Sequence, residues 1–199
     1  MSVIVELPRT WVASLERRLV TATSQTPSPF TGTTEVQDWG GEWWEYEIEF
    51  AAQSGPLARS ASAALTALGS GRGMLLFTDP SIEAKTVAQT ITLQLAASGG
   101  NLLQTQGWPP SSTAVLSGDF ISIGSGRDAR LHQVAFDVAA NTQGRAALTI
   151  FPAIRTSLPA GTVVEVNQPK VLLRPTSSVP TRIERVARHR FTMSAREAI

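Results

Sequence analysis

The chain has 199 residues, of which 42% are apolar and 17% are charged, and its 17 basic and 16 acidic side chains give a net charge of +1. This length fits one large domain or two small ones, and the balanced charge disfavours a general nucleic-acid binder, which needs a basic excess to displace counterions. The absence of cysteine excludes disulfides and thiolate metal sites. No apolar run approaches the length of a membrane helix, so we expect no membrane partner.

The first third of the chain contains an extended segment, a loop and an alternating strand. Residues 18–24 predict a strand, and residues 25–34 predict an extended loop because two prolines and a glycine punctuate them. Residues 43–50 alternate apolar side chains with Glu45, Glu47 and Glu49, which is the period of a strand. The carboxylate face is either a solvated outer face, the lining of an acidic channel or a contact for a basic partner.

A helix is predicted over residues 55–68. Pro56 suits its first turn and Gly69 ends it. The apolar stripe at three- and four-residue spacing consists of Leu57, Ala61, Ala64, Leu65 and Leu68. A short strand is expected next, over residues 73–78.

Residues 86–168 have the pattern of a separate β module. Short alternating segments are separated by frequent turn signals, and Pro152 is expected to end a strand over residues 145–150. The side chains expected to share faces of two of these strands are Ile91, Leu93 and Leu95, and then His132, Val134, Phe136 and Val138. Strands this short favour a small barrel.

The C-terminal segment predicts strands over residues 171–173 and 187–193 and is basic. Its arginines are Arg182, Arg185, Arg188, Arg190 and Arg196. This stretch, Arg188 and Arg190 in particular, could complement the glutamate strand, either beside it in one sheet or across a subunit boundary. Cross-strand pairs of opposite charge contribute only about 0.2–1 kcal/mol each, so they would set register more than stability.

We find no catalytic constellation. His132 and His189 are the only histidines, and both alternate with strand residues, which is typical of packed or hydrogen-bonded side chains. Two isolated histidines without cysteine disfavour a zinc site. The glycines of residues 69–73 follow a helix and precede a strand, the reverse of a phosphate-binding loop. We therefore expect no catalytic residue, no cofactor and no metal.

Aromatic and charged side chains supply candidates for interaction instead. Tryptophans near the glutamate strand could pack in a core or an interface, or stack on bases or sugars. Trp108, before two prolines, is expected to anchor a loop. The candidate interaction residues are Phe30, Trp43, Glu45, Glu47, Glu49, Trp108, Arg188 and Arg190.

An ordered set of short motifs runs through nearly the whole chain. The series opens with SPFTG at residues 28–32 and DWGGEWWE at residues 38–45, followed by GMLLFTDP at residues 73–80. Later members are GWP at 107–109, LSGDFI at 116–121 and LTIFP at 148–152. The set resembles the distal-tail, or tail-tip, proteins of long-tailed bacteriophages (siphophages).

This resemblance implies a fold, an assembly and a location. The implied fold is mainly β: a tail-tube-like β-sandwich with one flanking helix, formed by residues 1–85 plus 169–199, interrupted by a small inserted β-barrel domain at 86–168. It also implies a homo-oligomeric ring, commonly a hexamer, between the tail tube protein and the baseplate hub proteins. DNA would meet the ring only in transit through its lumen. The protein would be made in the host cytoplasm and reside in the virion, with no catalytic role.

A different function class is also open. The chain could be a carbohydrate- or receptor-binding β-sandwich module. That hypothesis predicts exposed tryptophans in a groove.

Overall fold

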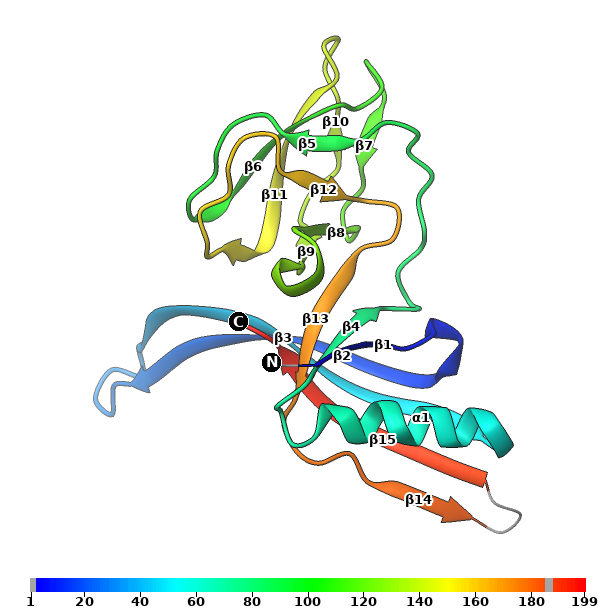
Figure 1. Cartoon of the computed structure of the whole chain (residues 1–199). Helices are drawn as coiled ribbons and strands as arrows, with labels where there is room; N and C mark the ends of the chain where they lie inside the picture. Colours follow the sequence, from blue (N-terminus) through cyan, green and yellow to red (C-terminus); the bar gives the residue numbers. More distant parts are fainter. Residues whose placement is uncertain (1–2, 185–187) are drawn as a thin grey trace.

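The computed structural model describes residues 3–184 and 188–199 and consists of an open sheet with a closed barrel above it (Figure 1). The described residues contain one α-helix, and the remaining regular structure is almost entirely β. The predicted mainly β fold with one helix and a small barrel is therefore confirmed.

The sheet has seven strands from both ends of the chain. Its order is β1–β4–β13–β15–β3–β2, and β14 pairs with β15 off this path. β1 runs parallel to β4, and the other pairings are antiparallel. The strands are β1 (Ile4–Glu6), β2 (Val12–Pro27), β3 (Thr34–Gln53), β4 (Met74–Thr78), β13 (Lys170–Pro175), β14 (Thr181–Glu184) and β15 (Arg188–Glu197).

Helix α1 (Gly55–Leu68) covers one face of this sheet, in the place that a second sheet takes in a sandwich (Figure 1). Its bounds match the prediction, but its buried stripe begins one residue later than expected. Ala58 is buried, whereas Leu57 is 55% exposed in the first turn. In the C-terminal half of the helix, Leu65 and Leu68 pack against the aromatic face of β3. The core residues contributed by that face are Trp44, Tyr46, Ile48 and Phe50, as the alternation predicts.

The barrel closes in the order β11–β6–β5–β12–β8–β9 and has its own apolar core. Its strands are β5 (Ile91–Leu93), β6 (Gly100–Gln106), β8 (Phe120–Ile123), β9 (Arg130–Val134), β11 (Arg145–Ile154) and β12 (Val163–Glu165). The pair β7 (Thr113–Val115) and β10 (Val138–Ala139) flanks it, and the short 3-10 turns are η1 (Arg9–Trp11) and η2 (Gly126–Asp128). All of these elements except η1 fall between residues 86 and 168.

Three details of the barrel differ from the sequence prediction. Leu95 and Phe136 are 53% and 64% exposed because β5 ends at Leu93 and β9 ends at Val134, so the alternation does not continue to them. β11 continues through Pro152 to Ile154. The β11–β6 register shifts between Thr149 and Ile154, and a proline is tolerated at such an irregularity because no ladder donor is needed there.

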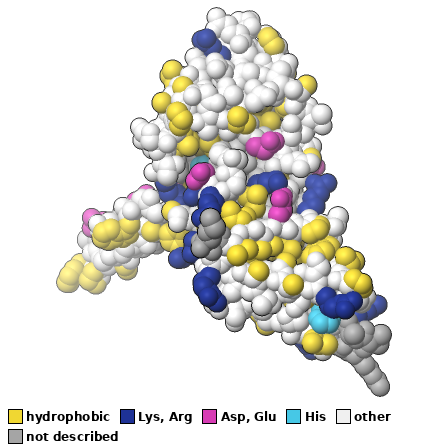
Figure 2. All heavy atoms as spheres, viewed as in Figure 1, with side chains coloured by type: hydrophobic (Ala, Val, Ile, Leu, Met, Phe, Trp, Pro, Cys, Tyr) yellow, Lys and Arg dark blue, Asp and Glu magenta, His cyan; other side chains and the backbone are white. Residues whose placement is uncertain are grey.

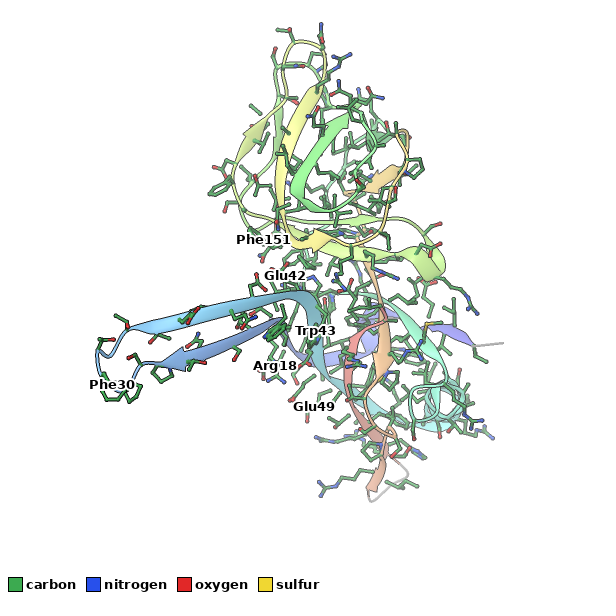
Figure 3. All side chains as sticks on the ribbon, turned by 90° about the vertical axis from the view of Figure 1, so that its left-hand side faces the viewer. Arg18, Phe30, Glu42, Trp43, Glu49 and Phe151 are labelled. Carbon is green, nitrogen blue, oxygen red and sulfur yellow. The ribbon has the colours of Figure 1, made fainter. Side chains whose placement is uncertain are left out.

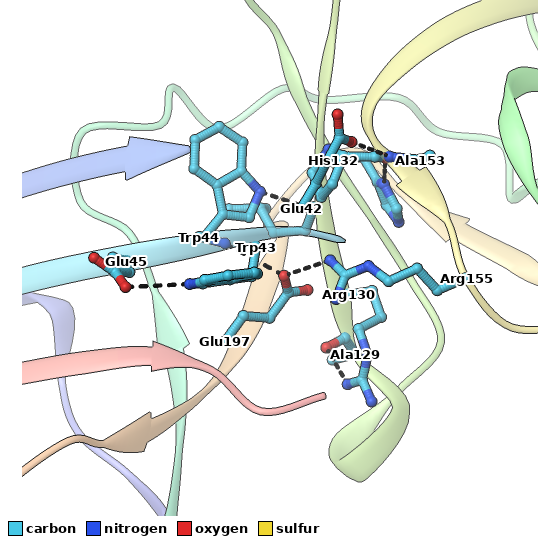
Figure 4. Close-up of polar contacts among 12 residues, drawn as sticks. Glu42, Trp43, Trp44, Glu45, Ala129, Arg130, His132, Ala153, Arg155 and Glu197 are labelled. Atoms are coloured by element: carbon cyan, nitrogen blue, oxygen red, sulfur yellow. Dashed lines mark hydrogen bonds and ion pairs between the residues drawn. The ribbon is translucent and has the colours of Figure 1, made fainter. Parts of the chain in front are cut away.

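Hydrogen bonds (Figure 4) and an aromatic contact join the barrel to the sheet. The indole Nε1 of Trp44 donates to the Leu131 carbonyl at 2.9 Å. The backbone N–H of Ala153 donates to the Glu42 carboxylate at 2.8 Å. Phe120 of the barrel lies 5.8 Å from the Trp44 ring and belongs to the core cluster of the sheet. The two units therefore share packed and polar contacts, in addition to the two chain connections.

Two ion pairs lie where the barrel meets the sheet, a region that we call the joint, and both involve buried carboxylates. Arg155, the residue after β11, pairs at 3.0 Å with Glu197 of β15, whose side chain is fully buried, and burial raises the pKa of that carboxyl. Arg17 of β2 pairs with Asp79, which is 1% exposed. The guanidinium of Arg17 also lies 4.0 Å from the Phe120 ring centroid. Losing one partner of such a buried pair leaves an uncompensated charge. Of the two ion pairs, Arg155–Glu197 links the barrel to the sheet, whereas Arg17 reaches the barrel through Phe120.

Candidate interaction surfaces

A two-stranded arm formed by the distal halves of β2 and β3 projects away from the sheet (Figure 1). The sequence predicts a loop over residues 25–34, but the structure continues both strands to Pro27 and Thr34 and leaves only a short turn. Phe30 lies at the tip with 94% of its surface exposed (Figure 3). The turn closes with a hydrogen bond from the Ser28 N–H to the Thr33 carbonyl at 2.8 Å.

Exposed apolar side chains continue along the arm. Val36 and Trp39 are 57% and 67% exposed, and Figure 2 shows hydrophobic side chains at the outer end of the arm. Single exposed apolar residues are ordinary, but this group gathers on one thin projection. The arm is therefore the strongest candidate for a protein contact on the described surface.

The predicted carboxylate face of β3 points outward from the sheet. Glu47 and Glu49 are exposed, and Glu49 accepts a hydrogen bond from the Ser14 hydroxyl at 2.9 Å. Glu16 of β2 lies directly opposite Glu47, and like charges in facing positions repel. This face therefore carries an acidic patch, which we define as Glu16, Glu47 and Glu49.

Glu45 differs from its two neighbours because it is already paired. Its carboxylate lies 2.7 Å from the Arg18 guanidinium and accepts a 3.1 Å hydrogen bond from the Trp43 indole. The hydrogen bond from Arg18, followed by that from Trp43, lowers the pKa of the Glu45 carboxyl. Trp43 thus sits half-buried at the root of the arm as the partner of a strand carboxylate.

The arginine-rich strand lies beside the glutamate strand, as one of the sequence alternatives proposed, but its register differs from the expectation. The facing pairs are Arg196 with Glu45, Ser194 with Glu47 and Thr192 with Glu49. Arg188 and Arg190 lie further along β15, where His189 faces Gln53. The arginine of β15 that lies opposite a glutamate of β3 is therefore Arg196, whereas Arg188 faces Glu184 of β14, and Arg185 lies outside the described residues.

Trp108 is a core residue, which corrects its prediction as an interaction residue. It is 3% exposed, and its indole donates to the Thr105 hydroxyl at 2.8 Å. Gly144 packs against the backbone of Trp108 at a φ of 68°, and its carbonyl accepts from the Trp108 N–H at 3.1 Å. A sequence reading cannot distinguish this packed tryptophan from an exposed one, because most of the core residues that bury it lie far from it in the chain.

The joint contains ionisable residues that the sequence did not single out as a group. His132 was expected to be a packed strand residue, and it is 4% exposed with Nδ1 2.7 Å from the Pro152 carbonyl oxygen. The Arg155–Glu197 pair could not be predicted from the sequence because the two residues are 42 positions apart. One signal was present: Glu197 is separated from Phe191 and Met193 by even numbers of residues, so alternation places it on the same buried face of the strand.

The residues that the structure describes gather no group of three or more side chains suited to hold a metal ion. Within the same residues, no helix has both the length and the apolar character needed to cross a membrane. No protein-family model matches the sequence, and no curated protein matches it either.

Proposed function

We propose that this protein is a structural virion component of a long-tailed bacteriophage, a distal-tail ring protomer that joins the tail tube to the baseplate hub. The observation that carries the proposal is the arm, which exposes Phe30, Val36 and Trp39 far from any core of its own chain. Aromatic side chains presented in this way suit burial against another protein. A projection on one side of a protomer that meets a different surface of its neighbour is the geometry from which closed rings form.

The acidic patch supports one orientation of the protomer within the proposed ring. We place Glu16, Glu47 and Glu49 toward the lumen, where their negative charge would repel the phosphates of DNA in transit. The patch lies on the outer face of the sheet, opposite the face that packs α1. Nothing in this arrangement requires catalysis, and the proposed role is assembly.

The receptor-binding alternative receives less support. It depends on exposed tryptophans in a groove, but Trp108 is buried in the barrel. Trp43 borders a hollow of about 180 Å³ together with Arg174 and Arg196. Pockets that hold small molecules usually measure about 300–1,000 Å³, so this hollow is too small to favour a glycan site.

Mass photometry of the purified chain tests the proposal across a concentration series. We expect a closed oligomer, and for a hexamer a mass of about 128 kDa, six times the 21.3 kDa chain. A density map of the intact phage particle should then show this fold between the tail tube and the baseplate hub. A chain that stays monomeric at every concentration and is missing from purified particles would sink the proposal.

A further inference from the structure

We propose that the arm of one protomer docks on the β14–β15 hairpin of a second copy of the chain, with the acidic, aromatic arm against the arginine-rich hairpin. This inference rests on the proposed ring function and names the two surfaces that form the contact between neighbours. Four observations carry it: the charge of the arm, the charge of the hairpin, the apolar side chains on both, and their placement at opposite ends of one strand.

The arm has a purely acidic character. No lysine or arginine occurs between Arg18 and Arg59, whereas the arm bears Glu35 and Asp38, both exposed. Because side chains alternate along a strand, Asp38 shares a face with Val36, whereas Trp39 lies at the register shift between Asp38 and Glu42. The arm therefore presents carboxylates close to exposed apolar side chains.

The β14–β15 hairpin has the opposite character. Arg182 and Arg188 are exposed, and Arg182 lies directly opposite Arg190 in the antiparallel register. Arg188 lies opposite Glu184, so the four facing pairs of the hairpin hold three arginines and one glutamate, which leaves the hairpin basic. Figure 2 shows the basic side chains gathered at this end of the molecule. Ile183, between these arginines, is 66% exposed and supplies an apolar contact.

The two surfaces cannot meet within one chain. β3 begins at the arm, at Thr34, and ends at Gln53, which pairs with His189 of the hairpin. The arm and the hairpin therefore lie at the two ends of a 20-residue strand, about 60 Å apart along its length at the usual rise per residue. Figure 1 shows them projecting in different directions. A contact between them must join two copies, head to tail, and such heterologous contacts close into rings.

The chain offers a clean chemical test because it contains no cysteine. One protein carries Asp38→Cys on the arm and a second carries Arg188→Cys on the hairpin, and the two are mixed with a short bis-maleimide linker. Each copy then holds a single thiol, so an arm-to-hairpin product must be intermolecular. Arg59→Cys, exposed on α1, replaces Arg188→Cys in the matched control. We expect a covalent dimer from the first mixture and none from the control.

Charge exchange gives an independent measurement. Glu35→Arg with Asp38→Arg reverses the arm, and Arg182→Glu with Arg188→Glu reverses the hairpin. Each variant alone should lower the oligomer fraction in mass photometry by about tenfold or more, because like charges then face each other. Mixing the two variants should restore assembly, since each reversed arm meets a reversed hairpin. All four positions are exposed, and circular dichroism of the separate variants verifies that they fold.

The outcomes separate this inference from the function on which it rests. Oligomers with the arm-to-hairpin product and restored assembly on mixing support it. Oligomers that form without the product, or that mixing does not restore, overturn the docking but leave the ring proposal standing. A wild-type chain that is monomeric throughout overturns both. Reversed hairpins that assemble normally but lose binding to duplex DNA or anionic vesicles overturn the docking and assign the hairpin to that other partner.

Discussion

Protonation of His132 should weaken the fold in mild acid. The pKa of this side chain is lowered to about 4 because burial penalises the imidazolium, and Arg155 and Arg130 act in the same direction. The hydrogen bond to the Pro152 carbonyl opposes them without reversing the shift. The folded-state pKa lies below the ordinary 6.5. The neutral imidazole therefore stabilises the fold fully above pH 6.5, and this contribution is lost as the pH falls toward 4.

The size of the effect follows from the two pKa values. The folded chain at pH 5 keeps His132 mostly neutral, whereas the unfolded chain has it mostly protonated. Integrating the proton linkage between those values gives a loss of about 2 kcal/mol in the free energy of unfolding between pH 7.5 and pH 5. This is a large part of the stability of a typical domain, at roughly 5–15 kcal/mol.

The assay is guanidinium unfolding of wild type and His132→Gln at both pH values. The glutamine cannot titrate and can still donate to the Pro152 carbonyl, so its stability should fall by about 2 kcal/mol less than that of wild type over this range. Burial raises the pKa of Glu197, so its contribution runs in the opposite sense and is lost as the pH rises. Both proteins retain Glu197, and its effect cancels in the comparison to first order.

His189→Gln is the matched control, because it removes the other histidine and leaves the joint unchanged. It should keep the wild-type loss between pH 7.5 and pH 5. If His132→Gln lost as much stability as wild type over this range, then His132 would not be held neutral by burial, and the reasoning about the joint would be wrong.

Two further substitutions have internal controls. Arg17→Met should cost about 3 kcal/mol or more in urea unfolding because it leaves the buried Asp79 carboxylate without its cation. Arg18→Met removes an exposed pair and should cost much less stability than Arg17→Met, and equal losses would contradict the assignment of Asp79 as a buried charge. Gly144→Ala should lower the thermal midpoint more than Gly161→Ala. Both glycines have positive φ, but only at Gly144 would an added Cβ collide with a backbone carbonyl. A smaller decrease in the thermal midpoint for Gly144→Ala than for Gly161→Ala would refute the close approach of Gly144 to the Trp108 carbonyl.

The sequence predicts best those features that depend on neighbours along the chain. The helix bounds follow from Pro56 and Gly69, and the buried face of β3 follows from strict alternation. Both signals are local: a proline fits the first helical turn, a glycine ends a helix, and alternate residues share a face of a strand. The inserted barrel was recognisable for the same reason, since short strands and turn signals are also local.

The arm and the joint could not be predicted, because they depend on contacts between distant residues. Residues 25–34 carry the prolines and glycine of a loop, but cross-strand hydrogen bonds extend both strands almost to the tip. Trp44 and Leu131 meet across 87 positions, and Lys170 and Glu6 across 164. A periodicity argument assigns a face to each residue but does not say which other element covers that face.

Strand β3 connects the features that the proposed function uses. Its inward side chains anchor it in the core, and Trp44 also hydrogen-bonds to the barrel at the root of the arm. Its outward side chains form most of the acidic patch, its first residues form half of the arm, and its last residue pairs with the hairpin strand β15. Because all three lie along one strand whose central part is anchored in the core, their order along that strand is fixed. A ring built on these contacts would then need little rearrangement of the protomer, which lowers the entropic cost of assembly.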